Sequence, residues 1–155
     1  MKRLEVSEIL NATLSGTEDL IAASGFTLER NIPESLPQVT GDLFALSQCL
    51  QNLITNAIKY GGSDRWIGIR AETVNSQIHI HVSDHGLGLE PQELPRIFDP
   101  FYRTEAAVNA QIHGTGLGLA LAKSIAEAMQ GQLSVRSIAG EGSIFTLTLP
   151  VTSQG

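Results

Sequence analysis

The stretch QCLQNLITNAIKY, from Gln48 to Tyr60, decides the fold because it predicts a helix with two unlike faces. At about 100° per residue, its polar side chains gather within about 100° of one another, while the apolar ones occupy the opposite side. Asp42 is a suitable N-cap for a helix over Leu43–Tyr60, and a glycine pair ends it. The residues of the polar face are Asn52, Asn56, Lys59 and Tyr60. One face of this helix therefore belongs in a core, and the other meets either a ligand or solvent.

The polar face of this helix has the chemistry of a metal and phosphate site. Amide oxygens are hard, neutral ligands for Mg²⁺, a triphosphate supplies the negative charge, and water completes the octahedron. Lys59 can neutralise phosphate oxygens. A solvated helix face is the competing interpretation.

The stretch GTGLGLALAK, from Gly114 to Lys123, is a glycine-rich turn that leads directly into a helix. Such a turn presents unpaired backbone N–H groups and the positive end of the helix dipole to an anion. A dinucleotide fingerprint needs a preceding buried strand, and a P-loop needs Lys in the turn, whereas Lys123 lies inside the helix. Phosphate is the expected ligand, and a glycine-rich helix start without a ligand is the alternative.

The stretch DHGLGL, from Asp84 to Leu89, follows an apolar strand. A buried carboxylate at Asp84 can accept a hydrogen bond from the exocyclic amine of adenine. Guanine carries an oxygen at the same position, so two acceptors would face each other, which is unfavourable. Gly86 and Gly88 let the backbone approach a flat ring. The alternative is an ordinary strand-to-loop turn.

The stretch RIFDPFYR, from Arg96 to Arg103, lies in an irregular segment that extends from Pro91 to His113. Phe98 and Phe101 can hold such a loop against the domain, and Arg103 can then reach a terminal phosphate. Aromatic residues under a long loop more often form a small core cluster, and both interpretations can hold together. The sequence predicts a lid over about residues 97–116.

The rest of the chain predicts one α/β domain over residues 1–155. Ser7 is the expected N-cap of a first helix, and Gly131 ends a third one. Periodicity and turn signals predict helices over 7–24 and 117–130, and strands over 4–6, 26–30, 66–73, 77–83, 132–137 and 143–149. The fold class is therefore an α/β two-layer sandwich, with three helices on one face of a mixed, mostly antiparallel sheet.

The composition limits the partners. The chain has 155 residues, 42% of them hydrophobic, with a net charge of −6, 10 Lys and Arg, and one cysteine. This balance argues against a nucleic-acid groove, and the sequence contains no apolar run long enough for direct membrane insertion. A reducing, cytoplasmic compartment and an isolated domain that is a monomer are expected.

The order and spacing of the four stretches resemble the ATP-binding catalytic domain of sensor histidine kinases, within the Bergerat-fold ATPase superfamily. The resemblance covers nearly the whole chain and implies ATP and Mg²⁺ as cofactors, with Asn56 as the metal ligand, Asp84 on adenine and Thr146 near adenine. The ligand-binding positions that it implies are Asn52, Asn56, Lys59, Tyr60, Asp84, Gly86, Gly88, Leu89, Phe98, Phe101, Arg103, Gly114, Thr115, Gly116, Leu117, Gly118, Leu119 and Thr146.

The resemblance also implies a reaction and its partners. The γ-phosphate of Mg-ATP would pass to a histidine on a separate dimerisation and phosphoacceptor domain of the parent kinase, with a response regulator downstream. That acceptor segment is absent from this sequence, the parent protein could be membrane-anchored, and no catalytic residue is assigned within the chain. The alternatives are a non-catalytic module that binds nucleotide or docks a partner, and a related protein-serine or anti-sigma kinase.

One departure from the family pattern and two further features bear on the resemblance. His85 and Leu87 stand where the family commonly has Asn and Pro. Asn52 stands where neighbouring branches of the superfamily carry a glutamate that activates water, so we expect slow intrinsic ATP hydrolysis. His79 and His81 alternate with core positions, which favours a polar face of the sheet over a metal site.

Overall fold

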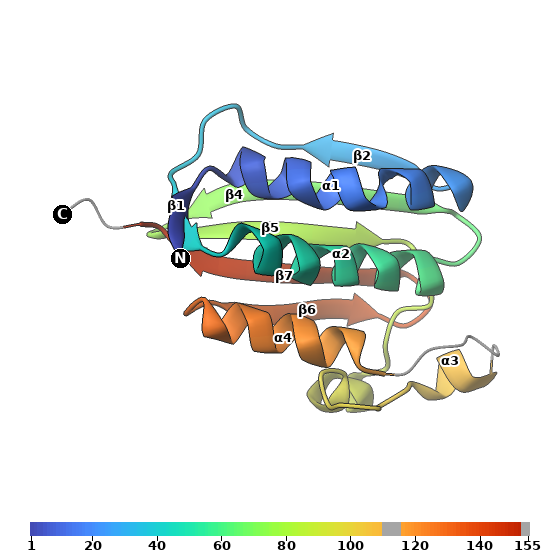
Figure 1. Ribbon diagram of the computed structural model, residues 1–155. Helices are drawn as coiled ribbons and strands as arrows, with labels where there is room; N and C mark the ends of the chain where they lie inside the picture. The colour runs from blue at the N-terminus through green and yellow to red at the C-terminus, as the bar shows by residue number, and fades with distance from the viewer. Residues whose placement is uncertain (110–115, 153–155) are drawn as a thin grey trace.

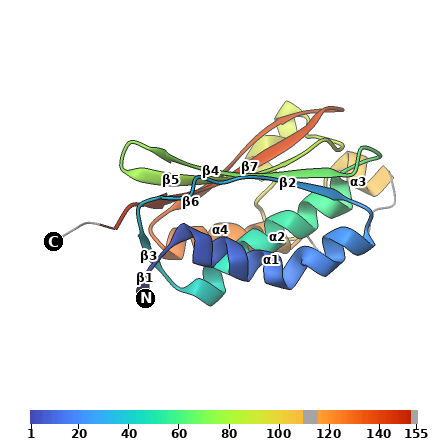
Figure 2. The same cartoon turned by 90° about the horizontal axis from the view of Figure 1, so that it is seen from above.

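The computed structural model describes residues 1–109 and 116–152. Its helices and strands form two layers, with α1, α2 and α4 together on one side of a five-stranded sheet (Figures 1 and 2). The elements are β1 (Lys2–Leu4), α1 (Val6–Ala23), β2 (Thr27–Asn31), β3 (Val39–Gly41), α2 (Leu43–Tyr60), β4 (Trp66–Val74), β5 (Gln77–Asp84), η1 (Pro91–Arg96), α3 (Glu105–Asn109), α4 (Gly118–Ala128), β6 (Gln132–Ile138) and β7 (Gly142–Pro150). The predicted fold class is confirmed.

The main sheet has the strand order β2-β4-β5-β7-β6. Neighbouring strands are antiparallel except for β2, which runs parallel to β4. The predicted hairpin at Asn75 is confirmed, and Asn75 takes the left-handed backbone conformation that a tight turn requires (φ 56°). The sheet is therefore mixed and mostly antiparallel, as the sequence predicts.

Helix α2 begins and ends where the sequence places it. The Ala45 N–H donates to the Asp42 side chain at 2.8 Å, so Asp42 is the N-cap, and Gly61 is the C-cap. Leu46, Leu50 and Leu53 are buried on its core face. Because this helix packs against both α1 and α4, it is the central element of the helical layer (Figure 1).

The start of α1 differs from the prediction. Its N-cap is Glu5 rather than Ser7, and Glu5 and Glu8 form a reciprocal capping box. Val6, which the sequence analysis placed in a first strand, is the first helical residue and is buried. The first strand is instead β1, over Lys2–Leu4. It pairs antiparallel with β3, a strand that was not predicted.

The segment between β5 and α4 contains more regular structure than the sequence indicates. The 3₁₀ helix η1 and the short helix α3 fall within the stretch predicted to be irregular. Helix α4 covers Gly118–Ala128, a shorter span than predicted. Within the described residues, no helix combines the length and apolar character that a membrane crossing requires.

The two faces of β5 have opposite characters. Ile78, Ile80 and Val82 lie in the core between sheet and helices. His79 and His81 alternate with them on the other face, where the His81 ring is hydrogen bonded to Glu72 and to Thr146, at 2.7 Å each. In the part of the chain that the structure describes, no group of three or more His, Cys, Asp or Glu side chains is arranged to hold a metal ion.

Burial in the core allows a prediction for a shortened side chain on β5, the central strand of the sheet. Ile80 is 0% exposed, so Ile80→Ala removes buried methyl groups and leaves a cavity. We expect a loss of about 2–5 kcal/mol in the free energy of unfolding, measured by urea denaturation. The matched control is Ile138→Ala on β6, where the side chain is 61% exposed and the expected loss is below about 1 kcal/mol. Equal losses in the two variants would contradict this assignment of the core.

Candidate functional site

A cavity of about 210 Å³ opens where α2, the end of β5, the start of α4 and the segment between them meet. Most residues predicted to bind a ligand line it, although they come from four separate stretches of the sequence. These residues are Asn52, Asn56, Lys59, Tyr60, Asp84, Gly88, Leu89, Arg103, Gly116, Gly118 and Leu119. The four stretches therefore form a single site.

The polar face of α2 forms one wall of the cavity. Asn52, Asn56, Lys59 and Tyr60 all reach it, as the helical wheel predicts. The Asn52 side-chain amide donates to the Gly118 carbonyl at 3.3 Å, which ties this wall to the first turn of α4. This face therefore lines a cavity, and its role as a ligand wall stays a prediction.

Asp84 ends β5 with its carboxyl group buried at 6% exposure. Burial raises the pKa of this carboxyl from its ordinary value of 3.8 to about 6, and hydrogen bonds from the backbone N–H groups of Gly86 and Ser143 oppose the rise. The Gly86 bond measures 2.9 Å. Perturbed carboxyl groups of this kind concentrate at functional sites.

The loop after Asp84 is packed closely between two other elements. The Leu87 N–H donates to the Tyr60 carbonyl at the end of α2 (3.0 Å), and the Leu87 carbonyl accepts from the Gly140 N–H in the β6–β7 turn (2.7 Å). A Cβ atom at Gly86 would collide with the Tyr60 carbonyl oxygen. Glycine is therefore required at this position by close packing between two backbones.

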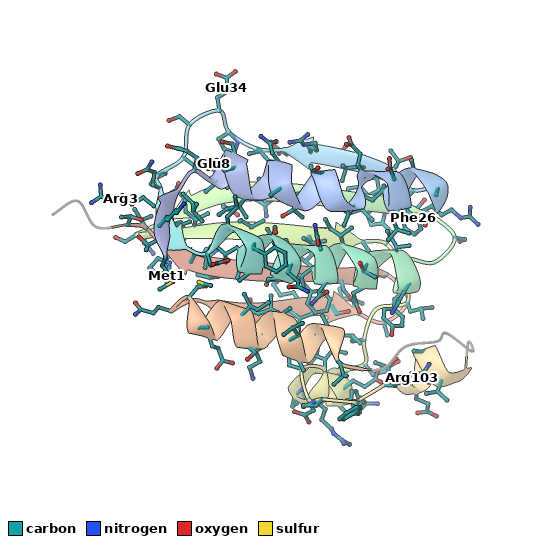
Figure 3. The ribbon with its side chains drawn as sticks, viewed as in Figure 1. Met1, Arg3, Glu8, Phe26, Glu34 and Arg103 are labelled. Carbon is teal, nitrogen blue, oxygen red and sulfur yellow. The ribbon has the colours of Figure 1, made fainter. Side chains whose placement is uncertain are left out.

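The third predicted stretch supplies one cation to the cavity. Arg103 lies in the segment that leads into α3 (Figure 3), and its buried Nε has no hydrogen-bond partner among residues 1–109 and 116–152. A buried donor without an acceptor carries a free-energy penalty, and an anion in the cavity would relieve it. This orphaned donor is the feature of the site that most directly indicates an anionic ligand.

Phe98 and Phe101 do not line the cavity. Phe98 packs edge to face against Phe145, with ring centroids 6.1 Å apart, and the Lys123 ammonium lies 5.8 Å from its ring centroid. Phe101 is 71% exposed, and its backbone N–H donates to the Gly116 carbonyl at 2.9 Å. Phe98 thus belongs to the core cluster that was the alternative interpretation, while the backbone of Phe101 holds the two ends of the predicted lid together.

The fourth stretch is described in part. Gly116, Gly118 and Leu119 line the cavity at the start of α4, whereas Leu117 is 41% exposed and does not. Gly114 and Thr115 lie outside the described residues.

The prediction that Thr146 lies near the ligand is wrong. Its side chain is on the face of the sheet opposite the helices, hydrogen bonded to His81. Ser143 and Phe145, which alternate with Thr146 along β7, line the cavity instead. The alternation with buried Leu147 and Leu149 is the signal that identifies the correct face.

Further cavity residues were not singled out from the sequence. Thr55 lies on α2 between the two predicted asparagines, and Tyr102 and Thr104 flank Arg103 in the chain. Each is next to a predicted residue: Thr55 and Tyr102 lie inside the quoted stretches, and Thr104 lies one residue beyond the third. The others in this group are Leu87, Ile97, Ser143 and Phe145.

The residues present fit an adenine nucleotide with a metal ion. A buried carboxylate can accept an exocyclic amine, Lys59 and Arg103 can meet phosphate oxygens, and the amide of Asn56 can ligate a hard cation. Apolar groups from Leu89, Ile97 and Phe145 complete the lining.

Comparisons with known proteins identify the family of this chain. The family described as histidine kinase-, DNA gyrase B-, and HSP90-like ATPase matches residues 41–153. The sensor protein kinase WalK of Staphylococcus aureus strain MRSA252 is 32% identical over 147 residues, which cover 94% of this chain and 23% of WalK. Another Staphylococcus aureus WalK sequence is 33% identical over 84% of this chain and 32% of its own length. The chain thus spans a third or less of the length of these relatives.

Solved structures show the same fold. The mycobacterial sensor histidine kinase MprB superposes with a TM-score of 0.83 at 23% identity, covering 99% of both chains. Full-length ShkA in complex with AMPPNP superposes with a TM-score of 0.83 at 24% identity, over 99% of this chain and 31% of ShkA. From the family match over residues 41–153, the chain belongs to the histidine kinase-, DNA gyrase B- and HSP90-like ATPases.

Proposed function

We propose that this chain binds Mg-ATP and transfers the γ-phosphoryl group to a histidine on a separate dimerisation and phosphoacceptor domain of a sensor kinase. The observation that supports it best is the cavity that gathers Asp84, Asn56 and the unpartnered Nε of Arg103. The AMPPNP complex of ShkA, which has the same fold, is consistent with ATP as the nucleotide.

Each wall of the cavity has a separate role in this proposal. Asp84 accepts the adenine amine, and the pinned loop that carries Gly86 and Gly88 lies along the purine ring. Asn56 holds Mg²⁺, which supplies charge neutralisation between the phosphate groups. Lys59 and Arg103 contact phosphate oxygens, with Arg103 on the terminal phosphate.

The reaction is a phosphoryl transfer to nitrogen. A neutral imidazole nitrogen of the acceptor attacks the γ-phosphorus in line, the bond from this phosphorus to the bridging oxygen breaks, and ADP leaves with the bonding electrons. The helix dipole of α4 and the cationic side chains stabilise charge on the phosphoryl oxygens. This chain therefore contributes binding, orientation and electrostatics, and the acceptor domain contributes the nucleophile.

The lining of the cavity favours transfer over hydrolysis. Among the described residues that line it, Asp84 is the only carboxylate, and Asn52 occupies the helix position one turn before Asn56. A general base for water is thus missing from this part of the site. A response regulator would receive the phosphoryl group from the acceptor histidine in the following step.

Nucleotide titrations test the two ends of the site. Asp84→Asn is expected to weaken ATP binding roughly tenfold or more, with or without Mg²⁺, because a charge-assisted hydrogen bond to adenine is lost. Asn56→Ala is expected to remove mainly the part of the affinity that depends on Mg²⁺. Isothermal titration calorimetry measures both. Asp19→Asn and Asn11→Ala, at exposed positions of α1, are the matched controls. Unchanged binding in both site variants would exclude this assignment of the pocket.

Asp84→Asn is also expected to stabilise the fold in a pH-dependent way. The folded-state pKa of Asp84 lies above its ordinary value, so the favourable contribution of the protonated group is complete below pH 3.8 and is lost as the pH rises through about 6. Above pH 6 the variant should gain about 2–3 kcal/mol in the free energy of unfolding, and near pH 4 almost none. Urea denaturation at several pH values measures the difference, and a gain independent of pH would contradict the expectation.

The chemistry of the phosphorylated product tests the acceptor. In the full-length parent protein incubated with γ-labelled ATP, we expect a protein-bound phosphate that is lost in acid, as a phosphohistidine is. The isolated chain should hydrolyse ATP slowly. An acid-stable phosphate would indicate a serine kinase instead, and rapid hydrolysis by the isolated chain would contradict the proposed mechanism.

A further inference from the structure

Glu93 is a buried acidic residue in η1, only 7% exposed. Its Oε1 accepts from the Glu90 N–H at 3.1 Å, which caps the start of η1. Its Oε2 accepts from the Tyr102 hydroxyl at 3.4 Å and from the Glu105 N–H at 3.2 Å. One carboxylate thus connects η1 to two points further along the chain.

Those two points bracket Arg103. Tyr102 precedes it, and Glu105 is the first residue of α3. Tyr102, Arg103 and Thr104 all line the cavity. The Glu93 carboxylate therefore holds a short cavity-lining segment at both of its ends.

Other contacts hold the tyrosine end of this segment. The Arg96 guanidinium lies 4.8 Å from the centroid of the Tyr102 ring, and the Tyr102 N–H donates to the Asp99 carbonyl at 3.2 Å. Partial burial and the neighbouring Glu93 charge raise the pKa of Tyr102, so the hydroxyl stays protonated and remains a donor. At the other end, the Thr104 hydroxyl oxygen accepts from the Ala107 N–H at 3.1 Å and caps α3.

Arg103 depends on this bracket for its position. Within residues 1–109 and 116–152, its Nε has no hydrogen-bond partner, and neither Arg103 nor Glu93 forms an ion pair. The position of the backbone on either side of Arg103 therefore bears directly on where its side chain points. Among the described residues, Glu93 is the one side chain that holds this backbone at both ends, through Tyr102 and Glu105.

We propose that Glu93 is a positioning residue that places Arg103 toward the terminal phosphate of the nucleotide. This inference rests on the proposed function, in which Arg103 contacts that phosphate. Glu93 touches no substrate atom and acts only through Arg103. A glutamine at position 93 has nearly the same shape, but it loses the charge and puts an amide group where the carboxylate accepts two bonds.

A double-mutant cycle tests the proposal, with affinities for Mg-ATP and Mg-ADP measured by calorimetry. We expect Glu93→Gln to weaken ATP binding about tenfold and ADP binding less than about twofold, because the misplaced group serves the terminal phosphate. In the Arg103→Ala background, Glu93→Gln should weaken ATP binding by less than about a further twofold, since the group through which Glu93 acts is gone. Tyr102→Phe removes one of the two hydrogen bonds to Glu93 Oε2 and should give a smaller loss of ATP affinity, again with little change in ADP affinity.

Glu105→Gln is the matched control, because it removes an exposed charge from the same segment and leaves the Glu105 N–H in place. It should leave both affinities unchanged. Additive losses in the cycle, or equal losses for ATP and ADP, would overturn the positioning role. If Glu93→Gln does not fold, Tyr102→Phe decides by the same ratio of ATP to ADP affinity.

The cycle also separates this inference from the proposed function. Failure of the unmodified chain to bind ATP would remove the proposed function itself. Binding that is weakened by Arg103→Ala but changed additively by Glu93→Gln would remove only the role of Glu93.

Discussion

The site depends on one packing constraint, which is the close contact of the Asp84–Leu89 loop with the end of α2 and with the β6–β7 turn. Leu87 bonds to Tyr60 on one side and to Gly140 on the other, and Gly86 lies where a side chain has no room. Through this contact, the carboxyl group at the end of the sheet is fixed relative to the polar face of the helix. The two walls of the cavity are thus held together, so the distance between the Asp84 carboxyl group and the polar side chains of α2 is set before any ligand arrives.

The same constraint explains why Asp84 has a raised pKa. The pinned loop removes the carboxyl group from water, and two backbone N–H groups and the nearby His85 offset the rise in its pKa only in part. A protein selected for stability alone would carry a neutral residue there. On the proposed function, the free energy that burial costs is recovered when an adenine amine donates to this carboxylate, which is the usual relation between a functional polar group and the fold that holds it.

Much of this structure could be predicted because it depends on local signals. Asp42 caps α2 by accepting a hydrogen bond from the Ala45 N–H, only three residues along the chain. The alternation of apolar and polar residues along β5 assigns its two faces without reference to any other strand. What could not be predicted depends on contacts between distant segments. The strand β3 is three residues long and exists because β1 pairs with it, and Glu5 rather than Ser7 caps α1 because Glu8 completes the box. Thr146 was misplaced by a resemblance, although its alternation with Phe145 and Leu147 assigns it to the opposite face. Tyr102 is held at the site in part by a hydrogen bond to Glu93, nine residues away.

The two halves of the cavity are held by different forces, and this difference has a consequence for how a nucleotide enters. The half formed by α2, β5 and β7 is part of the hydrophobic core, where each buried side chain contributes about 1.5–3 kcal/mol. The half formed by Tyr102, Arg103 and Thr104 is attached through hydrogen bonds and one ring contact, each with a net contribution of about 0.5–1.5 kcal/mol. The second half therefore opens at a much smaller free energy than the core unfolds. On the proposed function, the rigid half would hold the base while the segment that carries Arg103 opens and closes over the phosphates, so nucleotide exchange would require no loss of the fold.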